Sequence, residues 1–212
     1  MCGNHDVMAE EARKKLLTFD LEELIRKYHL EADDNYLYLR VFHKPYQIDR
    51  QTGSITSRDS AVPAPHNIAM AIYDMLCYSE DLKELPPLSG SWVTLSQLGG
   101  LVGAGHAKKL HDPEVLKPFY DKVSELNQIC KDLGGEESKG GDVSYRIPVF
   151  DFFPMWFQYW DADDEFPANI QFLWDKNSLY FLHFEILHHL TLYLEEYLAD
   201  AVTSSVEAKT DR

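Results

Sequence analysis

The clearest pattern along the chain is an alternation of apolar and polar positions with a period of two. It runs through residues 143–149, 155–160 and 170–175, and again through residues 36–57, where Gly53 lies in a turn-forming segment. Successive side chains of a β-strand point to opposite faces, so the alternation predicts strands that bury one face. We expect two or three antiparallel strands from the first region and a small antiparallel meander from the second.

Elsewhere, apolar residues recur every three or four positions, which is the spacing of a helix with one buried face. Asp20 and Glu23 have the spacing of a capping box, which starts a second helix soon after the first. Gly134 and Gly135 end a helix that begins at Asp112 and Pro113. Helices are therefore expected within residues 6–28, 66–79, 113–133 and 184–199, the last preceded by a helical turn from Ser178 and a break near His183.

These elements predict a single α+β domain that spans residues 1–212. A small, mostly antiparallel sheet takes its strands from residues 36–57 and 143–175 and packs against four to five helices. Hydrophobic residues make up 45% of the chain and aromatic residues 13%, which supplies a substantial core. Residues 1–5 and 202–212 are expected to be flexible tails.

The charge of the chain excludes two classes of partner. The formal net charge is −15, from 35 acidic and 20 basic residues. Such a field repels phosphate backbones and anionic lipids, so we expect neither nucleic acid nor a membrane surface as a partner.

The cysteines and the first residues indicate the compartment. Cys2, Cys77 and Cys130 are scattered and form no C-x-x-C pair, so neither a disulfide framework nor an iron–sulfur cluster is expected. Cys77 and Cys130 fall in helical patterns and are expected in the core. The N-terminal residues lack the features of a signal peptide, and no apolar run reaches about 18 residues. We therefore expect a cytoplasmic protein.

The most acidic short segment is "YWDADDEFPANIQFLW", residues 159–174, which joins two of the predicted strands. Its cluster of Asp163, Asp164 and Glu165 has two interpretations. The carboxylates form the rim of a site, as metal ligands or as a general acid whose pKa is raised by nearby aromatic rings. Alternatively they cap the amides of a hairpin turn, with Pro167 setting the extended start of the next strand. The second interpretation needs no ligand and is favoured.

Aromatic residues concentrate in the same strands, and half of them must face away from any one core. If helices cover both faces of the sheet, the excess is core, which we favour. If one face is open, Trp156 and Trp160 form an aromatic floor for a flat ligand, and Arg146 holds an anionic group. The candidate ligand-binding residues are Trp92, Arg146, Trp156, Trp160, Asp163, Asp164 and Glu165.

Two further segments contain residue types that occur in metal and phosphate sites. In "HFEILHH", Glu185 and His188 have the E-x-x-H spacing of di-iron sites, with His189 next to them, but no second such motif occurs, so a packing role is favoured over a metal site. "GSWVTLSQLGGLVGAGHAKKL" contains no complete phosphate-loop motif. We interpret it as a surface connection that Trp92 anchors to the core, with a mobile lid as the alternative.

The order of segments also carries a resemblance. The segments are "YQIDRQTGSI", "YDMLCYSEDL", "PLSGSWVTLSQLGG", "IPVFDFFPMWFQYW" and "DDEFPANIQFLWDKNSLYFLHFEIL". In this order the chain resembles the DUF3786 family, a bacterial family of domains of unknown function found chiefly in anaerobes. The resemblance covers roughly residues 15–200 and is most specific at "DEFPA", which is followed by a strand and an aspartate.

The resemblance implies a link to anaerobic cofactor or one-carbon metabolism. Members of the family sometimes follow an iron–sulfur domain like that of corrinoid methyl-transfer proteins, so the resemblance implies a corrinoid or iron–sulfur protein as partner. This chain lacks the cysteine-rich segment that would hold a cluster. The family carries no established catalytic residues, so the resemblance assigns none here.

Three functions remain open at this point. We favour a non-catalytic accessory module that binds a ligand or a partner protein. The first alternative is an enzyme in which Asp163 or Glu165 acts as acid or metal ligand and Arg146 holds an anionic substrate. The second is a self-associating structural protein that forms a homodimer through its aromatic face.

Overall fold

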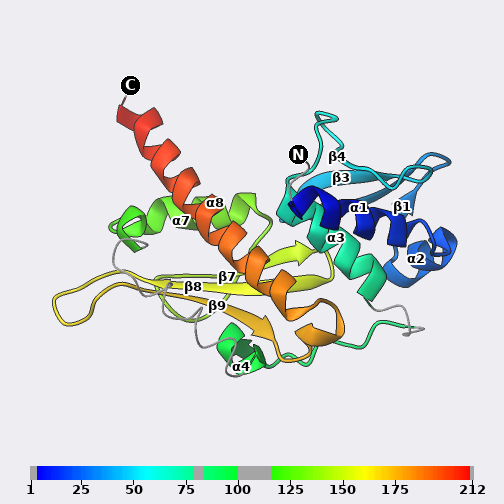
Figure 1. Cartoon of the computed structure of the whole chain (residues 1–212). Helices are drawn as coiled ribbons and strands as arrows, with labels where there is room; N and C mark the ends of the chain where they lie inside the picture. Colours follow the sequence, from blue (N-terminus) through cyan, green and yellow to red (C-terminus); the bar gives the residue numbers. More distant parts are fainter. Residues whose placement is uncertain (1–3, 79–83, 100–115, 211–212) are drawn as a thin grey trace.

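The computed structural model describes residues 4–78, 84–99 and 116–210 (Figure 1). The α+β class is confirmed: antiparallel sheets are packed against helices. The helices are α1 (Asn4–Leu16), α2 (Leu21–Tyr28), α3 (His66–Tyr78), α4 (Leu95–Gly99), α7 (Val123–Asp132) and α8 (Phe184–Thr210), with 3₁₀ turns η1 (Lys117–Phe119) and η2 (Ser178–Tyr180). The assignment of one domain with flexible ends stays a prediction.

The strands form two antiparallel sheets, whereas the sequence predicted a single sheet. The first has the order β1-β2-β3-β4, and the second has the order β5-β9-β8-β7-β6. Alternation within a strand shows which face is buried but not which distant strand lies beside it, so the number of sheets was not readable from the pattern. The strands are β1 (Glu31–Ala32), β2 (Tyr36–Val41), β3 (Lys44–Asp49), β4 (Ile55–Ser57), β5 (Trp92–Thr94), β6 (Glu136–Glu137), β7 (Val143–Phe150), β8 (Phe153–Trp160) and β9 (Asn169–Asp175).

The two sheets meet at the hairpin turn between β2 and β3. Only Phe42 and His43 lie between the paired residues Val41 and Lys44, and both have positive φ, 48° and 64°. A two-residue turn of this kind usually contains Asn-Gly, because bulkier residues are strained there. Phe42 is nevertheless 1% exposed, its amide donates to the Val149 carbonyl of β7 at 3.0 Å, and its ring stacks on Tyr193 of α8. The strained turn thus fixes the first sheet onto the second.

Helix α8 covers one face of the second sheet (Figure 1). The predicted stripe of leucines is fully buried, and Trp174 of β9 donates its indole N–H to Thr191 Oγ1 of α8 at 3.1 Å. The helix begins directly after His183, as expected, but continues to Thr210 instead of ending near Ala199. Val202 is 1% exposed, so burial continues beyond the predicted end. The leucines are Leu187, Leu190, Leu194 and Leu198.

Helix α8 also carries a carboxyl group with an unusual pKa. Burial raises the pKa of Glu195 from 4.5 to about 7, and the neighbouring Glu196 adds to the increase. The folded protein therefore holds a proton that the unfolded chain releases near pH 4.5, so stability falls as the pH rises from about 4.5 to about 7.

We expect Glu195→Gln to remove this loss. Above pH 7 the variant should be more stable than the wild type by about 1 kcal/mol. This difference is smaller than the pKa shift alone implies, because the side chain is only partly buried. At pH 5 the two proteins should unfold at similar urea concentrations. Urea denaturation at pH 5, 6, 7 and 8 measures the difference, with Glu185→Gln, at an exposed position of the same helix, as the matched control. A difference that does not change with pH would contradict the prediction.

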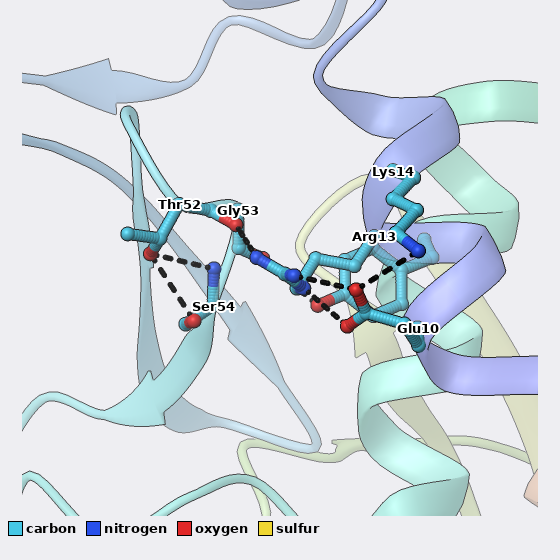
Figure 2. Close-up of polar contacts among 7 residues, drawn as sticks. Glu10, Arg13, Lys14, Thr52, Gly53 and Ser54 are labelled. Carbon is cyan, nitrogen blue, oxygen red and sulfur yellow. Dashed lines mark hydrogen bonds and ion pairs between the residues drawn. The ribbon is translucent and has the colours of Figure 1, made fainter. Parts of the chain in front are cut away.

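In the N-terminal half, the cap of α2 and the turn at Gly53 agree with the predictions from the sequence. Asp20 caps α2 through its side chain, which accepts hydrogen bonds from the amides of Glu22 and Glu23. Figure 2 shows how α1 is fixed to the turn between β3 and β4: Arg13 donates to the Thr52 carbonyl and to Glu10. Gly53 in this turn has a φ of +71° and leaves little room beside Arg13. Met8 of α1 was predicted to share the apolar face of this helix with Ala12 and Leu16, but it is 48% exposed.

Three other expectations need correction. The helix expected to run to Leu133 is interrupted between η1 and α7, because Asp121 adopts a φ of 59°; its expected start at residues 112–115 lies outside the described residues. The connection around Trp92 contains β5 and α4, and the segment after Gly135, which was predicted to be an exposed connector, contains β6. These elements span two to five residues, too short to produce a periodic pattern.

The cysteines that the structure describes lie in the core. Cys77 is 6% exposed and Cys130 is 0% exposed, as predicted, and both are free thiols. Burial raises the pKa of the Cys130 thiol far above its usual range, so this thiol stays protonated. Cys2 lies outside the described residues.

Candidate functional site

Two neighbouring hollows lie where the sheets meet. One, of about 530 Å³, is lined by aromatic rings from both sheets together with Arg40 and Arg58; we call it the Tyr38 hollow. The other, of about 470 Å³, is lined by Arg40, His43 and Arg146, and we call it the Arg146 hollow. Both volumes fall within the range of small-molecule sites. The rings of the Tyr38 hollow are Tyr28, Tyr38, Tyr46, Phe150 and Phe152.

An ion pair separates the two hollows. Arg40 and Asp151 line both of them, as does Phe152. Arg40 Nε lies 3.1 Å from Asp151 Oδ1, and its Nη2 lies 3.1 Å from Oδ2, so the guanidinium holds the carboxylate with two donors. Both side chains are about half exposed, at 51% and 55%. An exposed pair of this kind contributes about 0–1 kcal/mol and opens readily.

The second sheet places Arg146 at the edge of its hollow. In the cross-strand register Arg146 of β7 lies between Glu136 of β6 and Trp156 of β8, so these three side chains share one face. Arg146 is exposed, and within the part of the chain that the structure describes it makes no hydrogen bond or ion pair, not even with Glu136. Its donors therefore face solvent in the hollow.

The strained turn supplies the third polar group of this hollow. His43 is exposed, and its ring packs against Gly134, where an added Cβ would come 2.7 Å from His43 Nδ1. This contact holds the imidazole at the hollow. The backbone of His43 has a positive φ, a conformation that a non-glycine residue rarely adopts. Strain of this kind concentrates at functional sites, so the turn marks the Arg146 hollow as a candidate site.

The Tyr38 hollow is chemically different. The Arg58 guanidinium lies 4.2 Å from the centroid of the Tyr38 ring and 3.9 Å from Glu31. Tyr38 donates its hydroxyl proton to Asp33 at 2.6 Å, and this hydrogen bond raises the pKa of Tyr38 above its ordinary value. An arginine stacked on an aromatic ring beside further rings fits a flat, partly apolar group.

The structure brings together three of the predicted site residues. Trp92 and Trp156 meet edge to face with ring centroids 5.6 Å apart, and Trp156 is the cross-strand neighbour of Arg146. The Trp156 indole donates to Ser144 Oγ at 2.9 Å. This face is opposite the one that α8 covers, so the aromatic residues serve both the core and a second, half-buried face. The fully buried set is Phe153, Phe157, Tyr159, Phe172 and Trp174.

The other predicted site residues lie at the far end of the β8–β9 hairpin. Asp163, Asp164 and Glu165 are exposed in its loop, after Trp160 at the end of β8. Asp163 Oδ1 accepts hydrogen bonds from the amides of Glu165 and Phe166, at 2.8 and 2.7 Å. This is the turn-capping arrangement that the sequence favoured. These carboxylates share no hollow with Arg146.

The alternative of a metal site is not supported by any cluster of ligating side chains in the described ranges. There, no group of three or more histidine, cysteine or acidic side chains is arranged to hold a metal ion. His188 and His189 have ring centroids 5.8 Å apart, and Glu185 is exposed on α8. The glycine-rich segment from residue 100 to Lys109 lies outside the described residues.

Sequence reasoning missed Arg40, His43 and Asp151. One signal was available: "VFHK" joins two alternating runs with only Phe42 and His43 between them. That spacing predicts a two-residue hairpin turn, and the absence of asparagine or glycine in it indicates strain. The pairing of Arg40 with Asp151 had no signal, because the two lie 111 positions apart.

Comparison with known proteins decides the family. The family described as "Domain of unknown function (DUF3786)" matches residues 20–196. The chain belongs to this family. No curated protein matches, and neither does any solved structure. Among the residues that the structure describes, no helix is long and apolar enough to cross a membrane. The cytoplasmic location, the homodimer and the corrinoid or iron–sulfur partner stay predictions.

One buried aspartate of this DUF3786 protein has a clear structural role. The aspartate that follows "DEFPA" and its strand is Asp175, which is 0% exposed. Its carboxylate accepts hydrogen bonds from the amides of Ser89, Gly90 and Asn177 at 2.8–3.0 Å, and from Ser89 Oγ. Burial would raise the pKa of Asp175, but these hydrogen bonds together outweigh it and hold the pKa below its ordinary value. The residue fixes the loop before β5 to the end of β9.

Proposed function

We propose that this DUF3786 protein is a non-catalytic module that binds a small anionic molecule in the Arg146 hollow. The observation that carries the proposal is Arg146, an exposed arginine that lines a hollow and makes no hydrogen bond or ion pair with the described residues. A guanidinium presents a planar fork of N–H donors that matches a carboxylate or a phosphate. Arg40 and His43 line the same hollow and add further donors.

The charge of the whole chain supports a specific position for the anion. A net charge of −15 repels anions from most of the surface, whereas in the lining of this hollow two arginines balance two acids, Glu136 and Asp151. Asp151 also lines the hollow, but its charge is offset by Arg40. Glu136 lies on the far side of Arg146 from Trp156, on the two-residue edge strand β6. The anion would pair with Arg146, whose guanidinium makes no ion pair with Glu136 or with any other described residue.

An enzyme based on Asp163 or Glu165 receives less support. A general acid with a raised pKa needs a buried carboxyl group, and both side chains are exposed. Asp163 is also engaged with two turn amides. Neither group shares a hollow with Arg146, which the enzyme alternative needs for its substrate.

Isothermal titration calorimetry with inorganic phosphate and with phenyl phosphate tests the proposal. We expect Arg146→Gln to weaken the binding of both anions by about tenfold or more, because a charge-assisted pair of hydrogen bonds is lost. Arg26→Gln is the matched control: Arg26 is exposed on α2, lines neither hollow, and should leave both affinities unchanged. If neither anion binds the wild type, or if both variants lose the same affinity, the proposal fails.

The strained turn gives a second test. His43→Gly should raise the free energy of unfolding by about 0.5–1 kcal/mol, because glycine adopts a φ of +64° without a steric penalty. The same variant should bind phosphate more weakly, since a donor of the hollow is lost. Urea denaturation and calorimetry measure the two effects. His43→Asn, which tolerates this φ and keeps a polar side chain, should gain stability with a smaller loss of binding. A destabilised His43→Gly would show that the turn is not strained.

A further inference from the structure

The Tyr38 hollow and the Arg146 hollow share a wall, and that wall is built from groups that can separate. The shared residues are Arg40, Asp151 and Phe152. Arg40 comes from β2 of the first sheet, and Asp151 lies in the turn between β7 and β8 of the second. Their ion pair is half exposed, so it adds little stability and does not fix the wall firmly.

We infer that the two hollows are two subsites for one aryl anion, whose anionic group replaces Asp151 on Arg40 and whose ring enters the Tyr38 hollow. This inference rests on the proposed function, because it takes the Arg146 hollow as the anion subsite. It narrows the ligand class from small anions in general to aryl phosphates and aryl carboxylates. Asp151 then acts as an internal carboxylate that holds Arg40 until the ligand arrives.

The chemistry of Arg40 supports the exchange. Its Nε and Nη2 atoms hold the two Asp151 oxygens at 3.1 Å, which is the side-on geometry that a ligand carboxylate or phosphate also uses. The exchange conserves charge at the guanidinium, since one anion leaves as another arrives. Arg146 and His43 stabilise the incoming group further, and Asp151 moves into solvent from a turn position that is already exposed.

The chemistry of the Tyr38 hollow supports the aryl group. Five aromatic side chains line it, and Arg58 stacks on the Tyr38 ring at 4.2 Å. A second ring that enters the hollow gains aromatic contacts and displaces water from apolar surface. A purely inorganic anion gains none of these contacts, so the two kinds of ligand differ in affinity.

Calorimetry with phenyl phosphate and inorganic phosphate, which share the anionic group, separates the subsites. We expect the wild type to bind phenyl phosphate at least about tenfold more tightly than phosphate. Tyr38→Ala should reduce this ratio towards one without weakening phosphate. Tyr36→Ala is the matched control, since Tyr36 lies two residues earlier on β2 but does not line the hollow. Circular dichroism verifies that each variant is folded.

Two acidic residues test the exchange at Arg40. Asp151→Asn releases Arg40 and should tighten the binding of phenyl phosphate by about three- to tenfold. Glu136→Gln removes the same charge from the lining of the Arg146 hollow without releasing Arg40, so its effect should stay within about twofold. Equal effects of the two variants, or weaker binding by Asp151→Asn, would overturn the exchange.

The outcomes for this inference and for the proposed function are distinct. If phosphate binds at Arg146 but phenyl phosphate binds no more tightly, the two-subsite inference is overturned and the proposed function stands. If neither probe binds the wild type, the proposed function itself is overturned. Tighter binding of phenyl phosphate that Tyr36→Ala abolishes as strongly as Tyr38→Ala places the ring outside the Tyr38 hollow and also overturns the inference.

Discussion

Asp175→Ala is expected to lower the free energy of unfolding by about 3 kcal/mol. The carboxylate is 0% exposed, and its removal leaves the amides of Ser89, Gly90 and Asn177 without their acceptor. Each buried donor that loses its partner costs about 1–3 kcal/mol before the loop relaxes towards water. Urea denaturation at pH 7 measures the change. Asp175→Asn should lose less stability, because its side-chain amide oxygen still accepts some of these hydrogen bonds.

The control for this prediction is an aspartate with similar hydrogen bonds and no burial. Asp163 also accepts from two backbone amides, but it is exposed at the tip of the β8–β9 hairpin. Water replaces its hydrogen bonds, so Asp163→Ala should cost less than about 1 kcal/mol. Because the pKa of Asp175 is lowered, its contribution is present above pH 3.8 and is lost at lower pH. Equal losses for the two alanine variants at pH 7 would contradict the role assigned to Asp175.

Phe42→Ala should have the other large effect, a loss of about 3–4 kcal/mol. The ring is 1% exposed and stacks on Tyr193 with centroids 5.5 Å apart, so its removal leaves a cavity between the sheet junction and α8. Thermal and urea denaturation measure the loss. Because Phe42 also fixes the hairpin that carries His43, phosphate binding should weaken in the same variant.

A second substitution separates packing from strain at this position. Phe42→Gly makes the same cavity but relieves the φ of 48°, so it should be less destabilising than Phe42→Ala by about 0.5–1 kcal/mol. Phe166→Ala provides the exposed control: Phe166 is 66% exposed, and its loss should change stability by less than about 0.5 kcal/mol. A Phe42→Ala variant as stable as the wild type would show that the turn does not anchor the sheets.

Local features of the fold were predictable because they depend on neighbouring residues. Asp20 caps α2, the leucines of α8 face the core, and the strands from Val143 to Asp175 follow their alternation. The division of the strands into two sheets was not predictable. It depends on contacts between distant segments: the Phe42 amide meets the Val149 carbonyl 107 positions away (149 − 42), and Arg40 pairs with Asp151 111 positions away.

The candidate site was predictable only in part, for the same reason. Arg146 and Trp156 stand opposite each other in neighbouring strands of one hairpin, so their proximity follows from a short-range register. Arg40 and His43 reach the same place from another sheet, which no local pattern reveals. The acidic loop was a candidate site because of its composition, yet in the structure it forms a turn whose amides are capped by a carboxylate of the loop. The acid with the largest structural role is the buried Asp175, which composition does not single out.

The outermost strands of both sheets have a consequence for assembly. Each of β1, β4, β5 and β6 has only two or three residues, and β1 and β6 carry exposed glutamates. A long, uncharged edge strand would offer a template on which another chain can add a strand, whereas these edges are short and two of them are acidic. The protein is therefore protected against edge-to-edge aggregation, and recognition by strand addition is disfavoured. We therefore expect side chains, such as those that line the two hollows, to carry recognition by this protein.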